Sequence, residues 1–199
     1  MNFERLKTDV LDELLKLPEK YRYHNIEHTR EVMDYAVQLG AEAGLSAHEQ
    51  LLLDTAALMH DYGYLKCYHH NESHGAAAAE TILPQYGYAP DDVKAVADMI
   101  RATAPCCSPR NKLESLICDA DLGYLGTDKF DVRAADLRKE YMAMERELTD
   151  DEWFRMEHQF LSAFQYNSPE GRKLFGKGLA ASLAKINDLL ETRNEENKK

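Results

Sequence analysis

The sequence lacks several features that mark secreted and membrane-bound proteins. Its 199 residues include 4 cysteines, none in CxxC spacing, which disfavours a disulfide framework or a finger-type zinc site and favours reduced thiols. No apolar run reaches the length of a membrane span, and the first residues lack the apolar stretch of a signal peptide. We therefore expect a cytoplasmic protein without a membrane partner.

Positive charge is also in short supply. Lysine and arginine together number 24, against 35 aspartates and glutamates, and the formal net charge is −11. Polymeric nucleic acid is bound chiefly through basic surface, so we do not expect it as a partner. A small anionic substrate remains compatible with this composition, because a bound metal ion can supply positive charge locally.

Neither alternating strand patterns nor linkers rich in proline or glycine interrupt the sequence, and no internal repeat is present. Helical apolar spacing and caps at Asn25, Ser46 and Thr149 are found instead. The predicted helices span 3–17, 25–40, 46–61, 73–83, 90–104, 112–124, 131–148, 149–164 and 170–192. The expected fold class is all-α: a single helical bundle of about nine helices over 1–194, with a polar tail at 195–199.

Two of these predicted helices carry conspicuous apolar patterns. Residues 131–148 are expected to form a long amphipathic helix. The apolar face of the next helix, from Trp153 to Phe164, is expected to belong to the core rather than to a dimer interface.

One dipeptide stands out at the end of an apolar run. Residues 51–59 are apolar on every side of a predicted helix, which indicates burial, and His60-Asp61 follows directly. Ionisable groups in such a place are costly unless they are paired, hydrogen-bonded or bound to metal. The pair therefore needs a partner.

Other polar residues at inward positions supply candidates for that partner. His28 shares the apolar stripe of its helix with Val32, and Asp121 lies beside Ala120 and Leu122. Any one of these alone would more often be an ordinary buried residue. Two imidazoles and two carboxylates together in a helical core, however, describe a site for a divalent metal ion of intermediate softness.

The order of these segments resembles a known family. A YHNxxH start at 23–28, an apolar helix ending in HD, and a later CDADL segment at 118–122 are similar to the HD-domain metal-dependent phosphohydrolases. The YHNxxH start also resembles that of cyclic-nucleotide phosphodiesterases, and the likeness covers about residues 21–126. It implies four metal ligands, with Asp119 as an alternative for the last of them: His28, His60, Asp61 and Asp121.

The resemblance also implies catalytic roles. His24, one helical turn before His28, matches the histidine that protonates the leaving oxygen in the phosphodiesterases; the alternative is an exposed loop histidine. Asp61 could both bind the metal and orient a water molecule. The metal would lower the pKa of that water and so create a nucleophile.

Substrate contacts are less well defined by the sequence. His74 could contact phosphate or serve a second metal, or it could be part of a polar loop. Lys66 could offset phosphate charge, as could Arg101, although such residues are more often surface groups. Thr103 could hydrogen-bond phosphate or water. No histidine lies between positions 75 and 157, so the extra histidines of two-metal relatives are missing. One metal ion per site is therefore expected, whether Mn, Fe, Mg, Ni, Co or Zn.

The expected function is hydrolysis of a phosphomonoester or phosphodiester of a small anionic molecule, with a nucleotide as the first expectation. Two alternatives remain open. One is a non-catalytic nucleotide-binding module, which the complete ligand set disfavours. The other is an HD-fold iron oxygenase, which needs more ligands than the sequence offers.

Overall fold

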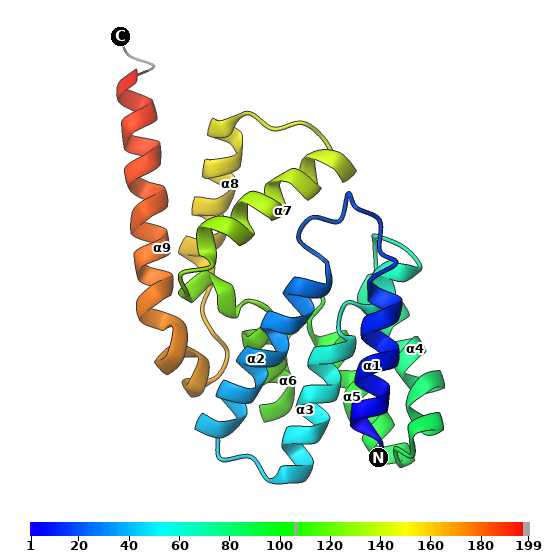
Figure 1. The fold of residues 1–199 in the computed structure, drawn as a ribbon. Helices are drawn as coiled ribbons and strands as arrows, with labels where there is room; N and C mark the ends of the chain where they lie inside the picture. The colour runs from blue at the N-terminus through cyan, green and yellow to red at the C-terminus, as the bar shows by residue number, and fades with distance from the viewer. Residues whose placement is uncertain (106, 197–199) are drawn as a thin grey trace.

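The computed structural model describes residues 1–105 and 107–196 and is built of α-helices (Figure 1). In this described part, nine α-helices are joined by loops and three short 3-10 helices, and no strand occurs, which confirms the all-α prediction. The α-helices are α1 (Phe3–Leu14), α2 (Ile26–Glu42), α3 (Ala47–Met59), α4 (Asn71–Ile82), α5 (Pro90–Ala102), α6 (Lys112–Asp121), α7 (Phe130–Met144), α8 (Asp150–Ala163) and α9 (Pro169–Glu196). The 3-10 helices are η1 (Tyr62–Leu65), η2 (Leu83–Tyr86) and η3 (Gly123–Gly126).

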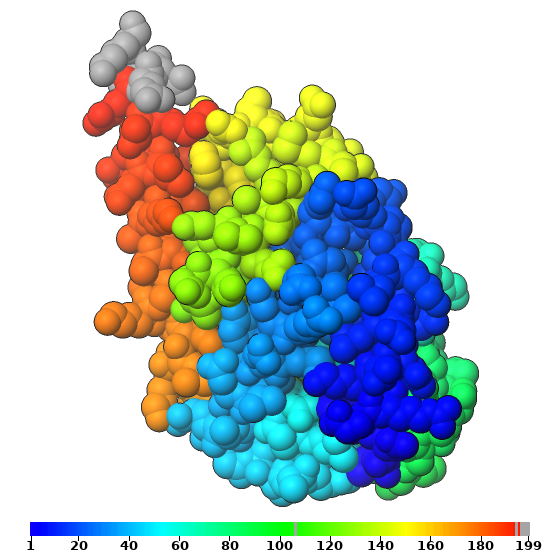
Figure 2. Space-filling model, viewed as in Figure 1, coloured from blue at the N-terminus to red at the C-terminus, as the bar shows by residue number. Residues whose placement is uncertain are grey.

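Helix α3 lies at the centre of the bundle and packs against α1, α2, α5 and α6, while α4 packs against α5 (Figure 1). Helices α8 and α9 pack together, and α9 also contacts η3. In Figure 2 the end of α9 rises beyond the body of the molecule at the upper left. None of the helices in the described ranges is both long and apolar enough to cross a membrane.

The central position of α3 follows from its composition. Leu53, Ala56, Ala57, Leu58 and Met59 have no solvent-exposed surface, as expected of a helix that is apolar on all sides. Burial of these apolar side chains stabilises the fold by roughly 25 cal/mol for each Å² of apolar surface removed from water. The residues that end the helix are therefore carried into the interior with it.

The predicted N-caps are confirmed. The Asn25 side chain accepts hydrogen bonds from the backbone N–H groups of Glu27 (2.9 Å) and His28 (3.2 Å) at the start of α2. Ser46 opens α3 and Thr149 opens α8, each in a capping box with the glutamate three residues later.

Several helix ends differ from the prediction. Helix α1 ends at Leu14 rather than residue 17, because the chain already turns ahead of Pro18. Helix α4 begins two residues earlier than expected, at Asn71, after His70 adopts a left-handed backbone conformation with φ 59°. Helix α9 continues to Glu196, into the predicted tail, whose residues 197–199 lie outside the described part of the chain. Cys67 and Cys118 are free thiols, and Cys106 also falls outside the described residues.

Helix α7 departs most from expectation. It ends at Met144 rather than 148, and the following segment forms a loop in which Arg138 donates to the backbone carbonyl of Leu148 (3.2 Å). Its buried residues include two charged ones, Arg133 and Glu140, so it is not a simple amphipathic helix. Arg133 donates to Glu31 on α2 (2.7 Å) and so ties α7 to the bundle.

The apolar face of α8 is only partly core. Trp153 and Leu161 are buried, each 3% exposed, but Met156 and Phe160 are 37% and 46% exposed. The expectation that this face belongs to the core therefore holds only in part, because the same four residues line a cavity.

Candidate metal centre and active-site cavity

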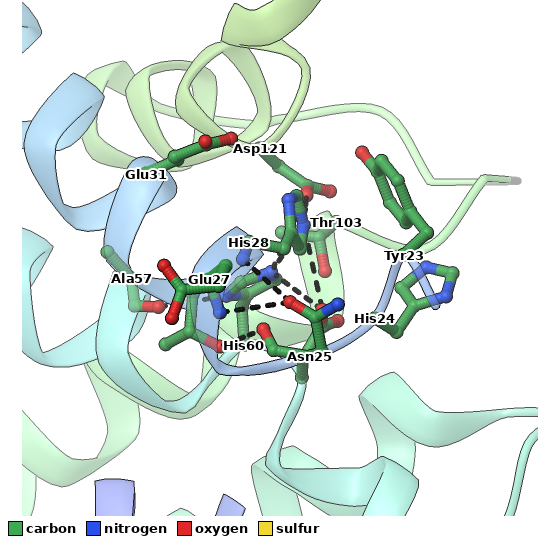
Figure 3. Close-up of polar contacts among 12 residues, drawn as sticks. Tyr23, His24, Asn25, Glu27, His28, Glu31, Ala57, His60, Thr103 and Asp121 are labelled. Carbon is green, nitrogen blue, oxygen red and sulfur yellow. Dashed lines mark hydrogen bonds and ion pairs between the residues drawn. The ribbon is translucent and has the colours of Figure 1, made fainter. Parts of the chain in front are cut away.

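Helix α2 positions the first candidate ligand. The Asn25 cap sets the start of the helix, and His28 in its first turn is 1% exposed. Figure 3 shows the ring of His28 directed toward Asp121 and His60. Nε2 of His28 lies 3.0 Å from Oδ1 of Asp121 and 3.3 Å from Nε2 of His60.

The end of α3 positions the second candidate ligand. Nδ1 of His60 donates to the backbone carbonyl of Ala57 (2.8 Å), and the side chain is 1% exposed. This hydrogen bond places the proton of the neutral ring on Nδ1 and leaves the lone pair of Nε2 facing His28. Such backbone anchoring of the far ring nitrogen is usual for histidines that bind metals.

The last turn of α6 supplies the carboxylate. Oδ1 of Asp121 lies 3.5 Å from Nε2 of His60, and one ligand atom from each of His28, His60 and Asp121 lies within 4.8 Å of the others. These three residues come from three helices far apart in the sequence. They form the one such cluster found within residues 1–105 and 107–196.

Asp119, the sequence-based alternative to Asp121, points elsewhere. It has no exposed surface, and its carboxylate accepts hydrogen bonds from the backbone N–H groups of Asn167 (2.7 Å) and Ser168 (2.8 Å). Their side chains donate as well, at 3.1 and 2.6 Å. Asp119 therefore anchors the loop between α8 and α9, and only Asp121 faces the histidine pair.

Asp61 borders the cluster and is the least satisfied group in it. Its Oδ2 lies 3.1 Å from Nε2 of His60 and 3.6 Å from Nε2 of His28. The atom is buried, however, and makes no well-aligned hydrogen bond. A buried carboxylate oxygen without a partner is costly. A cation between Asp61 and the histidines would remove that cost, so the residues present fit a divalent metal ion.

The carboxylates and histidines of the cluster shift the pKa values of one another toward the charged forms. Burial by itself lowers the pKa of His60, but the Asp61 and Asp121 carboxylates outweigh it and raise the pKa to about 9. Burial likewise opposes the charged form of Asp61, while the neighbouring histidines hold its pKa below the ordinary value. Two imidazole nitrogens with carboxylate oxygens form a donor set suited to Zn, Mn, Fe, Co or Ni.

His24 lies beside the cluster and is held by a residue that the sequence analysis missed. Nδ1 of His24 hydrogen-bonds one oxygen of Glu140, and the other oxygen accepts the backbone N–H groups of Tyr23 (2.8 Å) and His24 (3.0 Å). The His24 ring also stacks on Tyr64, with 4.3 Å between centroids. Glu140 has no exposed surface. Nothing near it in the sequence indicates this role, because it belongs to α7, 116 residues away.

The same contacts set the protonation of His24. Burial by itself lowers its pKa, but the hydrogen bond to Glu140 and the charge of Asp61 outweigh burial. The pKa of His24 therefore lies above its ordinary value. With Nδ1 engaged by Glu140, the Nε2 atom is the one available to a ligand.

A cavity of about 730 Å³ opens beside these residues. Its inner end is lined by His24, Asp61 and Asp121, and its far wall by α8. Cavities of roughly 300–1,000 Å³ are typical of sites for small molecules. Besides His24, Asp61 and Asp121, the described residues that line it include Thr103 and Asn71.

The candidate substrate contacts divide into two groups. Thr103 lines the cavity, although its hydroxyl donates to the carbonyl of Ile100 (2.8 Å). His74 is half-buried and Lys66 exposed, and neither lines the cavity. Arg101 is paired with Glu80 (2.6 Å).

Helix α4 instead contributes Asn71, a second residue that the sequence analysis missed. Asn71 is 5% exposed, lines the cavity, and its Oδ1 has no hydrogen-bond partner. The buried side of α4 is formed by Asn71, Gly75 and Ala79, which recur every four residues. His74 lies beside this row. Asn71 therefore lines the cavity, whereas His74, the residue predicted from this segment, does not.

The segment that carries the candidate ligands matches a known protein family. The family model of the HD domain matches residues 25–122, which include all four candidate ligands. The chain belongs to the HD-domain superfamily, as the sequence resemblance implied; most members of this family are metal-dependent hydrolases. Searches of curated proteins and of solved structures gave no significant match.

Proposed function

We propose that the chain is a metal-dependent phosphohydrolase that cleaves a phosphoester bond of a small organic phosphate. The observation that carries this proposal is Oδ2 of Asp61, which is buried beside His28 and His60 at the inner end of the cavity without a well-aligned hydrogen bond. One divalent ion per site is proposed, with four ligands: His28, His60, Asp61 and Asp121.

A divalent ion bound there would lower the pKa of water at the site and offset negative charge on the phosphoryl oxygens. The protein residues do the rest. The carbonyl of Ala57 holds the tautomer of His60 that presents Nε2 to the ion. Asp61, at the cavity surface, accepts a hydrogen bond from the attacking water and orients it toward the phosphorus.

His24 supplies the proton for the leaving group. Glu140 fixes the ring through Nδ1, so Nε2 carries the proton that is donated to the departing ester oxygen. The hydrogen bond to Glu140 and the charge of Asp61 raise the pKa of His24, which favours the protonated ring. General acids of this kind contribute typically ~10² to 10⁴-fold in rate.

The test is a hydrolysis screen of the metal-free protein reloaded separately with Mn, Mg, Ni, Co and Zn. The substrates are a phosphomonoester panel and a phosphodiester panel. We expect metal-dependent hydrolysis that is lost in His60→Ala and Asp61→Ala proteins. The matched control is His48→Ala, since His48 is exposed and pairs with Asp92 (3.0 Å) away from the site. It should keep wild-type activity.

Two results would overturn the proposal. Equal activity in His60→Ala, Asp61→Ala and wild-type proteins would show that the cluster does not carry the reaction. Tight nucleotide binding with no turnover under any of the five metals would instead identify a non-catalytic binding module.

A further inference from the structure

The cavity has a large apolar lobe beyond the metal centre. Trp153, Met156, Phe160 and Leu161 recur along one face of α8, and all four line the cavity. The exposed fractions of Met156 and Phe160, 37% and 46%, show that this face is not filled by the protein itself. A phosphoryl group and a metal ion occupy only the inner end of a cavity of about 730 Å³. The remaining space faces apolar side chains.

A second feature of the lobe is the charge of its lining. Among the described residues that line the cavity, none is a lysine or an arginine. Glu72 and Glu157 are acidic residues of the wall in addition to the candidate ligands. Sites for several phosphates recruit lysines and arginines, and this wall offers none.

The partial charges at the ends of the neighbouring helices also disfavour a second anionic group in the cavity. Helices α5 and α6 both end at the cavity, where Ala102 and Asp121 are among the lining residues. A helix C-terminus carries partial negative charge, which attracts a cation and repels an additional anion. Helix α4 begins there with Asn71, but Glu72 in its first turn already offsets that positive end.

We propose that the substrate carries a single phosphoryl group and that the rest of it is uncharged and largely apolar or aromatic, seated against α8. This inference rests on the proposed function and narrows its substrate class. Nucleoside monophosphates and cyclic nucleotides with their uncharged sugar and flat base meet the description, as do alkyl and aryl phosphates. Nucleoside diphosphates, nucleoside triphosphates and guanosine polyphosphates do not, because their additional charges would face Glu72 and Glu157. The cation near Glu157, Arg138, is outside the lining and already pairs with Asp150 (2.6 Å).

The single tryptophan of the sequence makes occupancy of the lobe measurable without turnover. Trp153 lies in the cavity wall, so its fluorescence reports a ligand there. The probes are methyl-, butyl- and hexylphosphonate, which cannot be hydrolysed and differ only in apolar length. Titrations are run with and without Mn²⁺. Affinity should rise about fourfold for each methylene buried, on the ordinary transfer free energy of a CH₂ group.

A second probe tests the exclusion of charge. Butane-1,4-bisphosphonate has the chain of butylphosphonate with another phosphonate at its far end. We expect it to bind at least about tenfold more weakly than butylphosphonate, because like charges meet in a partly desolvated space. In Met156→Lys protein the new cation should remove most of this difference.

The matched control for that variant is Gln159→Lys, which adds the same charge to α8 at an exposed position outside the cavity. It should leave both affinities as in the wild type. Equal affinity for all chain lengths, or stronger binding of the bisphosphonate to the wild type, would overturn the inference. A Trp153 signal that changes with protein concentration rather than with ligand would also contradict it. Such a signal would mean that this face of α8 is covered by a second copy of the protein.

The experiments distinguish failure of the proposed function from failure of the proposed substrate class. If the chain-length series holds but no phosphoester is hydrolysed with any metal, the proposed function is wrong and the preference of the lobe stands. If hydrolysis is observed but polyphosphates are the better substrates, the reaction class stands and the substrate class proposed for the lobe is wrong.

Discussion

Glu140 and His24 form a buried carboxylate–imidazole pair across 116 residues of sequence. The carboxylate of Glu140 also binds the backbone N–H of His24, so one side chain fixes both the main chain and the ring. Glu140 is fully buried, whereas the His24 side chain is 18% exposed and lines the cavity. The buried partner therefore orients the accessible one.

Replacing Glu140 should impair proton donation selectively. In Glu140→Gln protein the ring of His24 loses its charged partner, and hydrolysis of alkyl phosphates should fall by roughly 10²-fold, at the low end of the range for general acids. Hydrolysis of nitrophenyl phosphate should change much less, because nitrophenolate leaves without a proton. The measurement is kcat for both substrates in the variant and in His24→Asn. Equal losses on the two substrates would mean that Glu140 has only a structural role.

Substitution of Asp119 should lower stability, whereas substitution of Asp121 should weaken metal binding. Asp119 accepts hydrogen bonds from the loop before α9, and Asp121 faces the histidines. In Asp119→Asn protein, buried donors of Asn167 and Ser168 lose their charged acceptor. The unfolding free energy should fall by about 2–4 kcal/mol, or roughly 4–16 °C in melting temperature. Metal affinity should stay close to wild type.

The matched variant Asp121→Asn should show the opposite result. Its unfolding free energy should stay within about 1 kcal/mol of the wild type, while metal affinity falls at least about 100-fold, beyond what loss of an outer partner costs. Thermal unfolding and calorimetric metal titration measure the two quantities. Loss of metal binding in Asp119→Asn instead would reverse the assignment.

Asn71 offers a case in which stability and activity diverge. Its buried Oδ1 has no partner, so Asn71→Ala removes an unsatisfied group and should leave the protein as stable as before or more stable. The unpartnered Oδ1 is available to accept a hydrogen bond from a substrate hydroxyl or N–H group in the cavity, and its loss should lower kcat/KM roughly three- to tenfold. Chemical denaturation and steady-state kinetics test the pair of effects. Lower stability with unchanged kinetics would show that Asn71 is structural.

Gly63 sets how closely the segment after His60-Asp61 approaches α4. A Cβ at this position would come within 1.8 Å of the carbonyl oxygen of Asn71. Gly63→Ala should therefore destabilise the fold by about 1–3 kcal/mol and weaken metal binding by shifting Asp61. Gly176→Ala is the control, since a Cβ there meets nothing within 4 Å. On α9 it should stabilise by about 0.5–1 kcal/mol. Identical melting temperatures for the two variants would contradict this packing.

Local sequence signals accounted for the helices because they act over a few residues. The all-round apolar run of α3 predicted its burial, and the Ser46 cap predicted its start. His28, His60 and Asp121 could be singled out because each interrupts an apolar stripe, and the structure brings them together. Asp61 was singled out with them and borders the cluster.

The remaining features depend on packing between distant segments. Glu140 looks like any acidic residue of a polar helix until α7 places it under His24. The face of α8 was expected to be core because an apolar stripe is the same whether protein or ligand covers it. His74 was predicted as a substrate contact because a histidine is chemically conspicuous. Asn71 was not predicted, although the rotation of α4 turns it into the cavity.

The central claim is that the cluster around His60 binds one divalent ion on which hydrolysis depends. The most direct test follows phosphoester hydrolysis while chelator-treated protein is titrated with Mn²⁺ or another activating metal. We expect no activity at the start, a rise that ends at one ion per chain, and no rise in His60→Ala protein. Full activity before any metal is added, or the same titration curve in His60→Ala, would contradict it.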